Sequence, residues 1–100
     1  MIRNPDRSTA AEKQKFILFI SGMSPKSGNA IENITKICDQ YFPNASELQI
    51  IDIRKDGEVA VRYQVIAVPT LMRTSPEPVK TILGDLSDTK KILKILDIVE

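Results

Sequence analysis

The residues that most often do chemistry in proteins are scarce in this chain, which has one cysteine, Cys38, and no histidine among its 100 residues. These counts exclude an internal disulfide, a CxxC couple, a Cys/His zinc site and a Cys–His or Ser–His–Asp catalytic pair. Cys38 lies among apolar residues at helical spacing, which predicts a buried thiol with a raised pKa. Asp85, Asp88 and Asp97 match no calcium-loop spacing and are expected on a solvated face. The sequence therefore predicts neither a metal nor a cofactor.

Charge and hydropathy narrow the class of partner. Fourteen basic and thirteen acidic side chains leave a net charge of +1, so no strong field attracts nucleic acid or an anionic membrane. No stretch approaches the ~20 apolar residues of a membrane span, and the polar N-terminus has no signal-peptide core. We therefore expect a cytoplasmic protein with neither nucleic acid nor membrane as partner. We predict a flexible N-terminal arm over residues 1–14 and a single domain over residues 15–100.

The first half of that domain predicts a strand, a helix and a second strand. Phe16–Ile20 is an uninterrupted apolar run, typical of a strand buried on both faces. Ser24 followed by Pro25 is a helix-start signal, because serine caps free N–H groups and proline at the first helical position loses no hydrogen bond. Leu48–Ile53 is the expected second strand, with Ile50 among its covered residues.

The second half contains a segment whose pattern fits two structures. In Glu58–Ile66 apolar residues alternate as in a strand, yet several also share one helical face. Leu71–Met72 and Val79–Leu83, joined by the proline-containing loop 74–78, predict an antiparallel pair, and Ser87 is expected to cap a last helix. A helical Glu58–Ile66 gives the order βαβαββα, the thioredoxin-like mixed sheet with helices on both faces. A strand there excludes that layout.

Thioredoxin-like proteins keep their chemistry at two places that can be compared with this sequence. The turn before the first helix carries CxxC in redox members, but here it is Ser24-Pro25-Lys26-Ser27, a degenerate redox turn. Serines neither form a disulfide nor ionise near neutral pH, so dithiol exchange is excluded. The second place is Val68-Pro69-Thr70, which resembles the cis-proline motif of that fold, and we expect the bond before Pro69 to be cis.

Several stretches together resemble the KaiB family of circadian clock proteins. They are Phe19–Gly22, Ser24-Pro25, Ser27, Ile51–Ile53, Ala67–Leu71, Pro76–Lys80 and Ile82–Asp88. The most specific is Pro-Glu-Pro-Val followed by Gly-Asp-Leu-Ser-Asp, and the resemblance runs from about Phe16 to Ile98. It implies a non-enzymatic protein that binds a KaiC-type ATPase of the RecA class and modulates its phosphorylation or signalling output.

The resemblance also implies further partners and a second fold. One implied partner is KaiA, and a second is a sensor histidine kinase that competes for KaiC. The chain is also implied to bind further copies of itself in a dimer or tetramer. The oligomer is expected to have the order βαββααβ, with the second half of the chain rebuilt. A segment patterned for both strand and helix lets two such packings differ by only a few kcal/mol. The expected switch residues are Pro69, Thr70, Pro76, Pro78, Gly84, Asp85, Ile95 and Asp97.

Partner contacts are expected from the second strand and from the rebuilt half. The residues concerned are Gln49, Ile51, Glu58, Arg62 and Gln64. Asn29, Gln49 and Thr81 stand where clock members carry basic residues, and Ile95 replaces a glycine of the cyanobacterial form. Ile95 favours a helix and therefore the thioredoxin-like order. These departures point to a KaiB-like protein outside a complete clock, with a role in stress adaptation.

Two other interpretations stay open at this point. One is a thioredoxin-fold enzyme or thiol-binding protein without CxxC, acting through Cys38 or Ser24. The other is a KaiB-like adaptor for a different partner, which shares every sequence feature with the leading interpretation.

Overall fold

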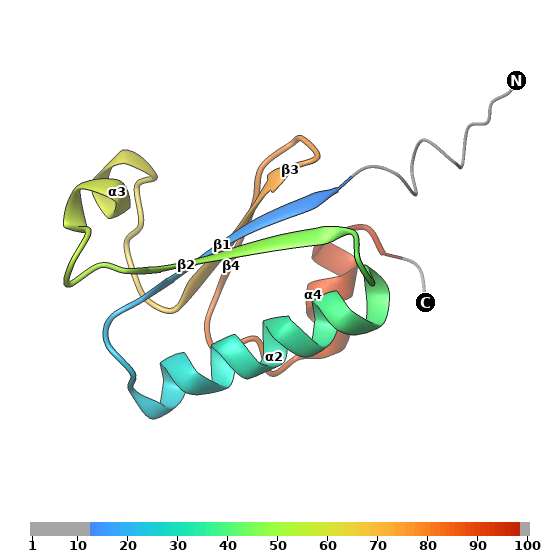
Figure 1. The fold of residues 1–100 in the computed structure, drawn as a ribbon, viewed down its shortest axis with the longest axis horizontal. Helices are drawn as coiled ribbons and strands as arrows, with labels where there is room; N and C mark the ends of the chain where they lie inside the picture. Colours follow the sequence, from blue (N-terminus) through green and yellow to red (C-terminus); the bar gives the residue numbers. More distant parts are fainter. Residues whose placement is uncertain (1–12, 99–100) are drawn as a thin grey trace, which may run out of the picture.

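Seven helices and strands follow one another in the computed structural model, which describes residues 13–98 (Figure 1). They are β1 (Gln14–Ile20), α2 (Pro25–Tyr41), β2 (Ser46–Asp52), α3 (Gly57–Arg62), β3 (Thr70–Ser75), β4 (Lys80–Leu83) and α4 (Thr89–Ile95). The segment with two interpretations is helical, so the predicted order βαβαββα is confirmed. Most of the predicted arm lies outside the described residues, and its last residue, Gln14, begins β1. No helix within residues 13–98 combines the length and apolarity needed to cross a bilayer.

The sheet has the strand order β2-β1-β3-β4. β1 pairs in parallel with β2 and antiparallel with β3, and β3 pairs antiparallel with β4. β1 is therefore a central strand, and all five residues of Phe16–Ile20 are buried. An uninterrupted apolar run fits this place because both faces of the strand are covered.

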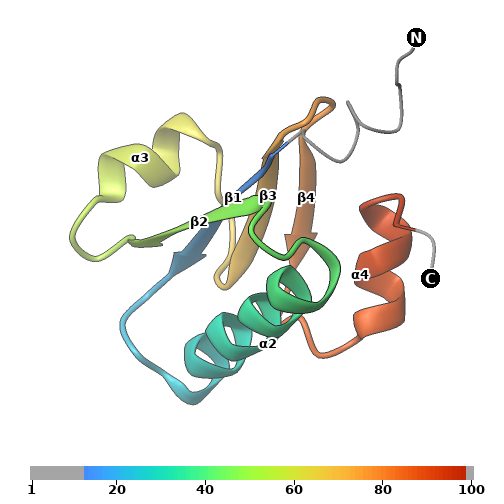
Figure 2. The same cartoon turned by 45° about the vertical axis from the view of Figure 1, so that its right-hand side comes forward.

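Helices α2 and α4 cover one face of the sheet (Figure 2). The buried side chains of this face come from every element except β2 and α3 and include the thiol of Cys38. They are Phe16, Leu18, Ile20, Ala30, Ile34, Ile37, Cys38, Leu71, Ile82, Leu86, Ile92, Leu93 and Leu96.

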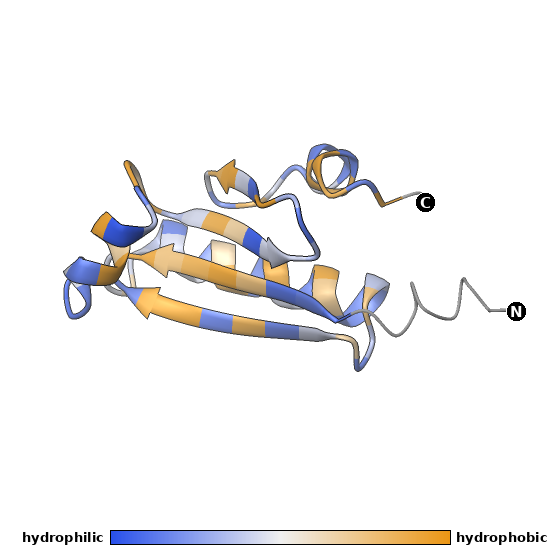
Figure 3. Ribbon diagram, turned by 90° about the horizontal axis from the view of Figure 1, so that it is seen from above, coloured by the Kyte–Doolittle hydropathy of each residue, from blue (hydrophilic) through white to orange (hydrophobic). Residues whose placement is uncertain are grey.

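The opposite face is covered by α3 alone among the described helices (Figure 3). Its buried residues are Ile17, Phe19, Ile51 and Met72, against which Ile53, Val59, Val65 and Val68 pack. Because α3 has only six residues, it covers one end of this face and leaves the rest without a helix above it. The prediction of helices on both faces is confirmed.

Three local predictions were wrong. Ile50 faces the same side of the sheet as Leu18 but is 44% exposed, because β2 is an edge strand and the core under α2 and α4 does not reach it. The cap of α4 is Asp88 rather than Ser87, since the helix begins at Thr89 and the Asp88 carboxylate accepts a hydrogen bond from the N–H of Lys91 at 3.1 Å. β3 is longer than the expected pair Leu71–Met72, because it has a hydrogen-bonded neighbour on each side.

Candidate functional site

The turn that carries CxxC in redox proteins is a closed helix cap in this chain. Ser24 is the N-cap of α2, and its hydroxyl oxygen accepts from the N–H of Ser27 at 3.2 Å. The Ser24 hydroxyl also donates to the Ser27 hydroxyl at 3.1 Å, and Ser27 is buried. Pro25 takes the first helical position and Lys26 is exposed. The turn therefore fixes the start of α2 and presents no thiol.

Cys38 lies inside the core on the α2 side of the sheet. Its side chain is buried, as predicted. Burial raises the pKa of the thiol, a hydrogen bond with Ser46 opposes that shift, and the nearby charge of Asp39 adds to it. A buried thiol with a raised pKa is a poor nucleophile.

Asp52 ties together the loops that follow β1 and β2. Its carboxylate accepts hydrogen bonds from the N–H of Gly22 at 3.1 Å and from the N–H of Arg54 at 3.0 Å, and pairs with the Arg54 guanidinium. The hydrogen bond from the Arg54 side chain is the largest cause that lowers the pKa of Asp52, to about 2. Both oxygens of this carboxylate therefore accept hydrogen bonds within the protein. Among residues 13–98, no three His, Cys, Asp or Glu side chains gather in a way that could hold a metal.

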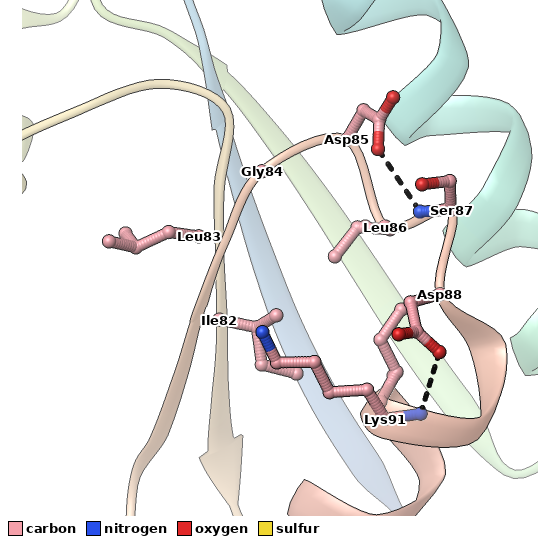
Figure 4. Close-up of a pocket in the computed structure, with 9 residues that line it drawn as sticks. Ile82, Leu83, Gly84, Asp85, Leu86, Ser87, Asp88 and Lys91 are labelled. Atoms are coloured by element: carbon pink, nitrogen blue, oxygen red, sulfur yellow. Dashed lines mark hydrogen bonds between the residues drawn. The ribbon is translucent and has the colours of Figure 1, made fainter.

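The Gly-Asp-Leu-Ser-Asp motif forms the turn between β4 and α4 and borders a hollow of about 190 Å³ (Figure 4). Gly84 has φ +108°, a conformation that favours glycine. The Asp85 carboxylate accepts from the N–H of Ser87 at 3.1 Å, and the Asp85 carbonyl accepts from the side chain of Asn33 at 2.9 Å. Leu86 turns its side chain into the core. The polar groups of Asp85 and Asp88 are thus used in hydrogen bonds within the protein, so the motif is a structural turn in this fold.

The other expected switch residues lie around β3 and at the end of α4. Three are prolines that follow cis peptide bonds, Val68–Pro69, Ser75–Pro76 and Glu77–Pro78, so the prediction for Pro69 is confirmed. Thr70 begins β3 and is buried. Ile95 is the last residue of α4, and Asp97 has φ +62° and pairs with Lys80 at 3.7 Å.

Tyr63, directly after α3, divides the partly covered face of the sheet into two grooves. Its ring packs against Phe19, with centroids 5.7 Å apart. A groove of about 280 Å³ lies on the β2 side and includes Lys15, Glu47 and Gln49 in its lining. A second groove, of about 330 Å³, lies on the β4 side and runs from Tyr63–Ile66 across β3 to Thr81 and Leu83.

Large apolar side chains are exposed in α3, in the segment that follows it and at the end of β4. Val61 is 78% exposed, Ile66 is 87% exposed and Leu83 is 55% exposed. We call this region the α3 surface and define it by its exposed residues. They are Glu58, Val61, Arg62, Tyr63, Gln64, Ile66 and Leu83. Apolar groups bordered by charges suit a protein partner better than a small polar substrate.

The structure places most of the expected contact residues at or beside the α3 surface. Glu58, Arg62 and Gln64 belong to it, and Gln49 lines the groove on the β2 side. Ile51 differs, because it is 6% exposed and packs under α3. In this fold Ile51 therefore lies beneath α3 and not on the α3 surface.

Sequence reasoning missed the exposed apolar residues of this surface. The segment Glu58–Ile66 did carry a signal, since neither a helix nor a strand could bury all of its apolar residues. Val59 and Ala60 face the sheet in the observed helix, which leaves Val61 outside.

Comparisons with known proteins agree with this fold. The family model of the KaiB domain matches residues 17–98. The circadian clock oscillator protein KaiB of Trichodesmium erythraeum is 37% identical over 81 residues, which cover 81% of this chain and 78% of the relative. KaiB1 of Synechocystis sp. is also 37% identical over 81 residues, covering 81% of this chain and 77% of that protein.

Solved structures show the same architecture at lower identity. The N-terminal domain of Synechococcus elongatus SasA aligns with a TM-score of 0.71 and 20% identity, over 87% of this chain and 86% of that domain. The Drosophila melanogaster thioredoxin Deadhead aligns with a TM-score of 0.68 and 17% identity, over 92% and 86% of the two chains. The fold is thus thioredoxin-like, and the family match together with the identities to clock proteins shows that this chain belongs to the KaiB family.

Proposed function

We propose that this chain is a non-enzymatic regulator that binds a KaiC-type ATPase of the RecA class through the α3 surface and modulates its phosphorylation or signalling output. The proposal is carried by one observation: Val61 in α3 and Ile66 after it are 78% and 87% exposed, and Ile66 lines the groove on the β4 side. Exposed clusters of large apolar side chains mark sites of protein interaction. The relatives named as circadian clock oscillator proteins support a clock-type regulatory role.

The described fold is the form that we propose to be competent for binding. The resemblance to clock proteins implies that the thioredoxin-like order is the one that contacts the ATPase. The second form, a homodimer or homotetramer with the order βαββααβ, is part of the same proposal. In it the residues after α3 repack, including the turn at Gly84 and Asp85.

Further partners follow from the same family relation. We propose that a sensor histidine kinase, and KaiA where it exists, compete for or join the complex, in the cytoplasm. Loss of basic side chains at Asn29, Gln49 and Thr81 favours a role in stress adaptation outside a complete clock.

Binding is tested by size-exclusion chromatography with light scattering, on the protein alone and after hours with the KaiC-type ATPase encoded nearest to it, in the presence of ATP. We expect a slowly formed complex and a free protein larger than a monomer. Ile66→Glu should weaken the complex at least about tenfold, because a carboxylate replaces an apolar contact. Met23→Glu is the matched control: Met23 is 73% exposed but lies in the loop before α2, so binding should not change.

Two results would redirect the proposal. Binding by Ile66→Glu as tight as that of the unmodified chain and of Met23→Glu would mean that the α3 surface is not the contact. No complex with a competent ATPase would support the second candidate, a KaiB-like adaptor for a different protein.

A further inference from the structure

A recess of about 460 Å³ beside the end of α4 contains a buried arginine that the proposed function does not use. Arg73 of β3 lines this recess and is 6% exposed. Its Nη1 donates to the carbonyl of Leu96, the C-cap of α4, at 3.1 Å. Its Nε is buried with no hydrogen-bond partner. The edge of the guanidinium formed by Nε and Nη2, which binds carboxylates side-on, thus has no acceptor among the described residues.

The charge of Arg73 also lacks a counterion among residues 13–98. The ion pairs of this part of the chain do not include Arg73. Lys80 is the cross-strand partner of Arg73, so two cations stand directly opposite each other on the same face of the sheet. Asp97, which lines the same recess, pairs with Lys80 at 3.7 Å. A buried cation without a counterion is costly, which makes an anionic ligand favourable here.

The remaining lining sets the kind of anion. Phe42, Pro76, Pro78, Leu96 and Ile98 give the recess apolar walls. Gln14 adds an amide whose Oε1 is also buried without a partner, and an amide turned over presents its NH2 group as a donor instead. Glu77 and Asp97 are exposed acidic side chains in the same lining. Their charges disfavour a multiply charged phosphate more strongly than they disfavour a single carboxylate.

We propose that this recess is a binding site for a small organic acid, with its carboxylate on the free edge of Arg73 and the amide of Gln14 and its apolar body against Phe42 and the prolines. The site lies on the α2–α4 side of the sheet, and the α3 surface lies on the other side. It therefore does not depend on the proposed binding of an ATPase.

The test is a titration of the ¹⁵N-labelled full chain with sodium benzoate, followed by amide NMR. We expect saturable shifts at Gln14, Arg73, Leu96 and Ile98, with a dissociation constant in the millimolar range that is usual for ligands of this size. Benzamide, the neutral isostere, and inorganic phosphate should bind at least about tenfold more weakly, since each lacks either the charge or the fit.

Variants separate a ligand site from a purely structural arginine. Arg73→Met should weaken benzoate binding at least about tenfold, and Gln14→Leu should weaken it severalfold while it keeps the cation. Arg54→Met, at an exposed arginine elsewhere, should leave binding unchanged. If Arg73→Met does not fold, the contrast between benzoate and benzamide in the unmodified chain and the Gln14→Leu result decide. Benzoate shifts that fail to saturate, or equal affinity for benzamide, would overturn the proposal and leave Arg73 as a cap of α4.

Discussion

The side-chain amide of Asn33 in α2 donates a hydrogen bond of 2.9 Å to the backbone carbonyl of Asp85, 52 residues later in the chain. The bond joins the first half of the chain to the turn before α4. It is partly buried, so loss of the donor leaves the carbonyl without its partner.

Asn33→Ala should therefore lower the free energy of unfolding by about 1 kcal/mol. Asn29→Ala is the matched control, because Asn29 lies on the same helix, is exposed, and gains the same helix propensity. The two variants are compared by urea unfolding. Equal midpoints would show that the bond to Asp85 contributes nothing to stability.

The acid stability of the fold should depend on Asp52. The pKa of this carboxyl is lowered from 3.8 to about 2, chiefly by the hydrogen bond from Arg54. A lowered pKa in the folded state means that the stabilisation is complete above pH 3.8 and is lost as the pH falls toward 2. Asp52→Asn should flatten the dependence of the unfolding midpoint on pH in this window. NMR titration of the Asp52 carboxyl carbon should give a midpoint near 2, and a midpoint at the ordinary value would refute the pairing with Arg54.

Gly22 and Gly28 should respond in opposite ways to alanine. Gly22 has φ +66°, and an added Cβ would stand 2.7 Å from the Arg54 guanidinium carbon. Gly22→Ala should cost about 1–2 kcal/mol through the left-handed backbone alone. Gly28 lies within α2 with open space around its Cα, so Gly28→Ala should add about 0.5–1 kcal/mol of stability. Thermal or urea unfolding of both variants measures the difference, and loss of stability in both would contradict the account of Gly28.

The buried thiol of Cys38 should react slowly. Modification by a thiol reagent in the native protein should be at least about a hundredfold slower than in urea, because the reagent must wait for the core to open. The rate is measured from the absorbance of the thiolate that the reagent releases when it modifies Cys38. Rapid modification of the native protein would revive the interpretation of a thiol-binding protein.

The order of elements could be predicted in the first half of the chain because local patterns there have one solution. The apolar run Phe16–Ile20 and the Ser24-Pro25 cap each fit one structure only. Glu58–Ile66 fits two, and the choice between them involves tertiary contacts such as that of Tyr63 with Phe19, which lies 44 residues earlier in the sequence. No local pattern can report such a contact.

The candidate sites show the same division. Exposed polar residues such as Glu58 and Arg62 could be expected at a surface from their type. The exposure of Ile66 and the burial of Arg73 run against residue type, so only the tertiary structure reveals them. Ile51 and Ile50 could not be told apart, because strand alternation fixes which side each faces but not whether a helix covers that side.

The central place of β1 shapes how the chain folds while it is being synthesised. β1 is translated first, but its antiparallel neighbour β3 ends at Ser75 and leaves the ribosome several seconds later. Its parallel neighbour β2 and the helix α2 come in between, so the strand–helix–strand half can assemble while one edge of β1 is still unpaired. During that interval an apolar strand edge is open to chaperones and to other nascent chains.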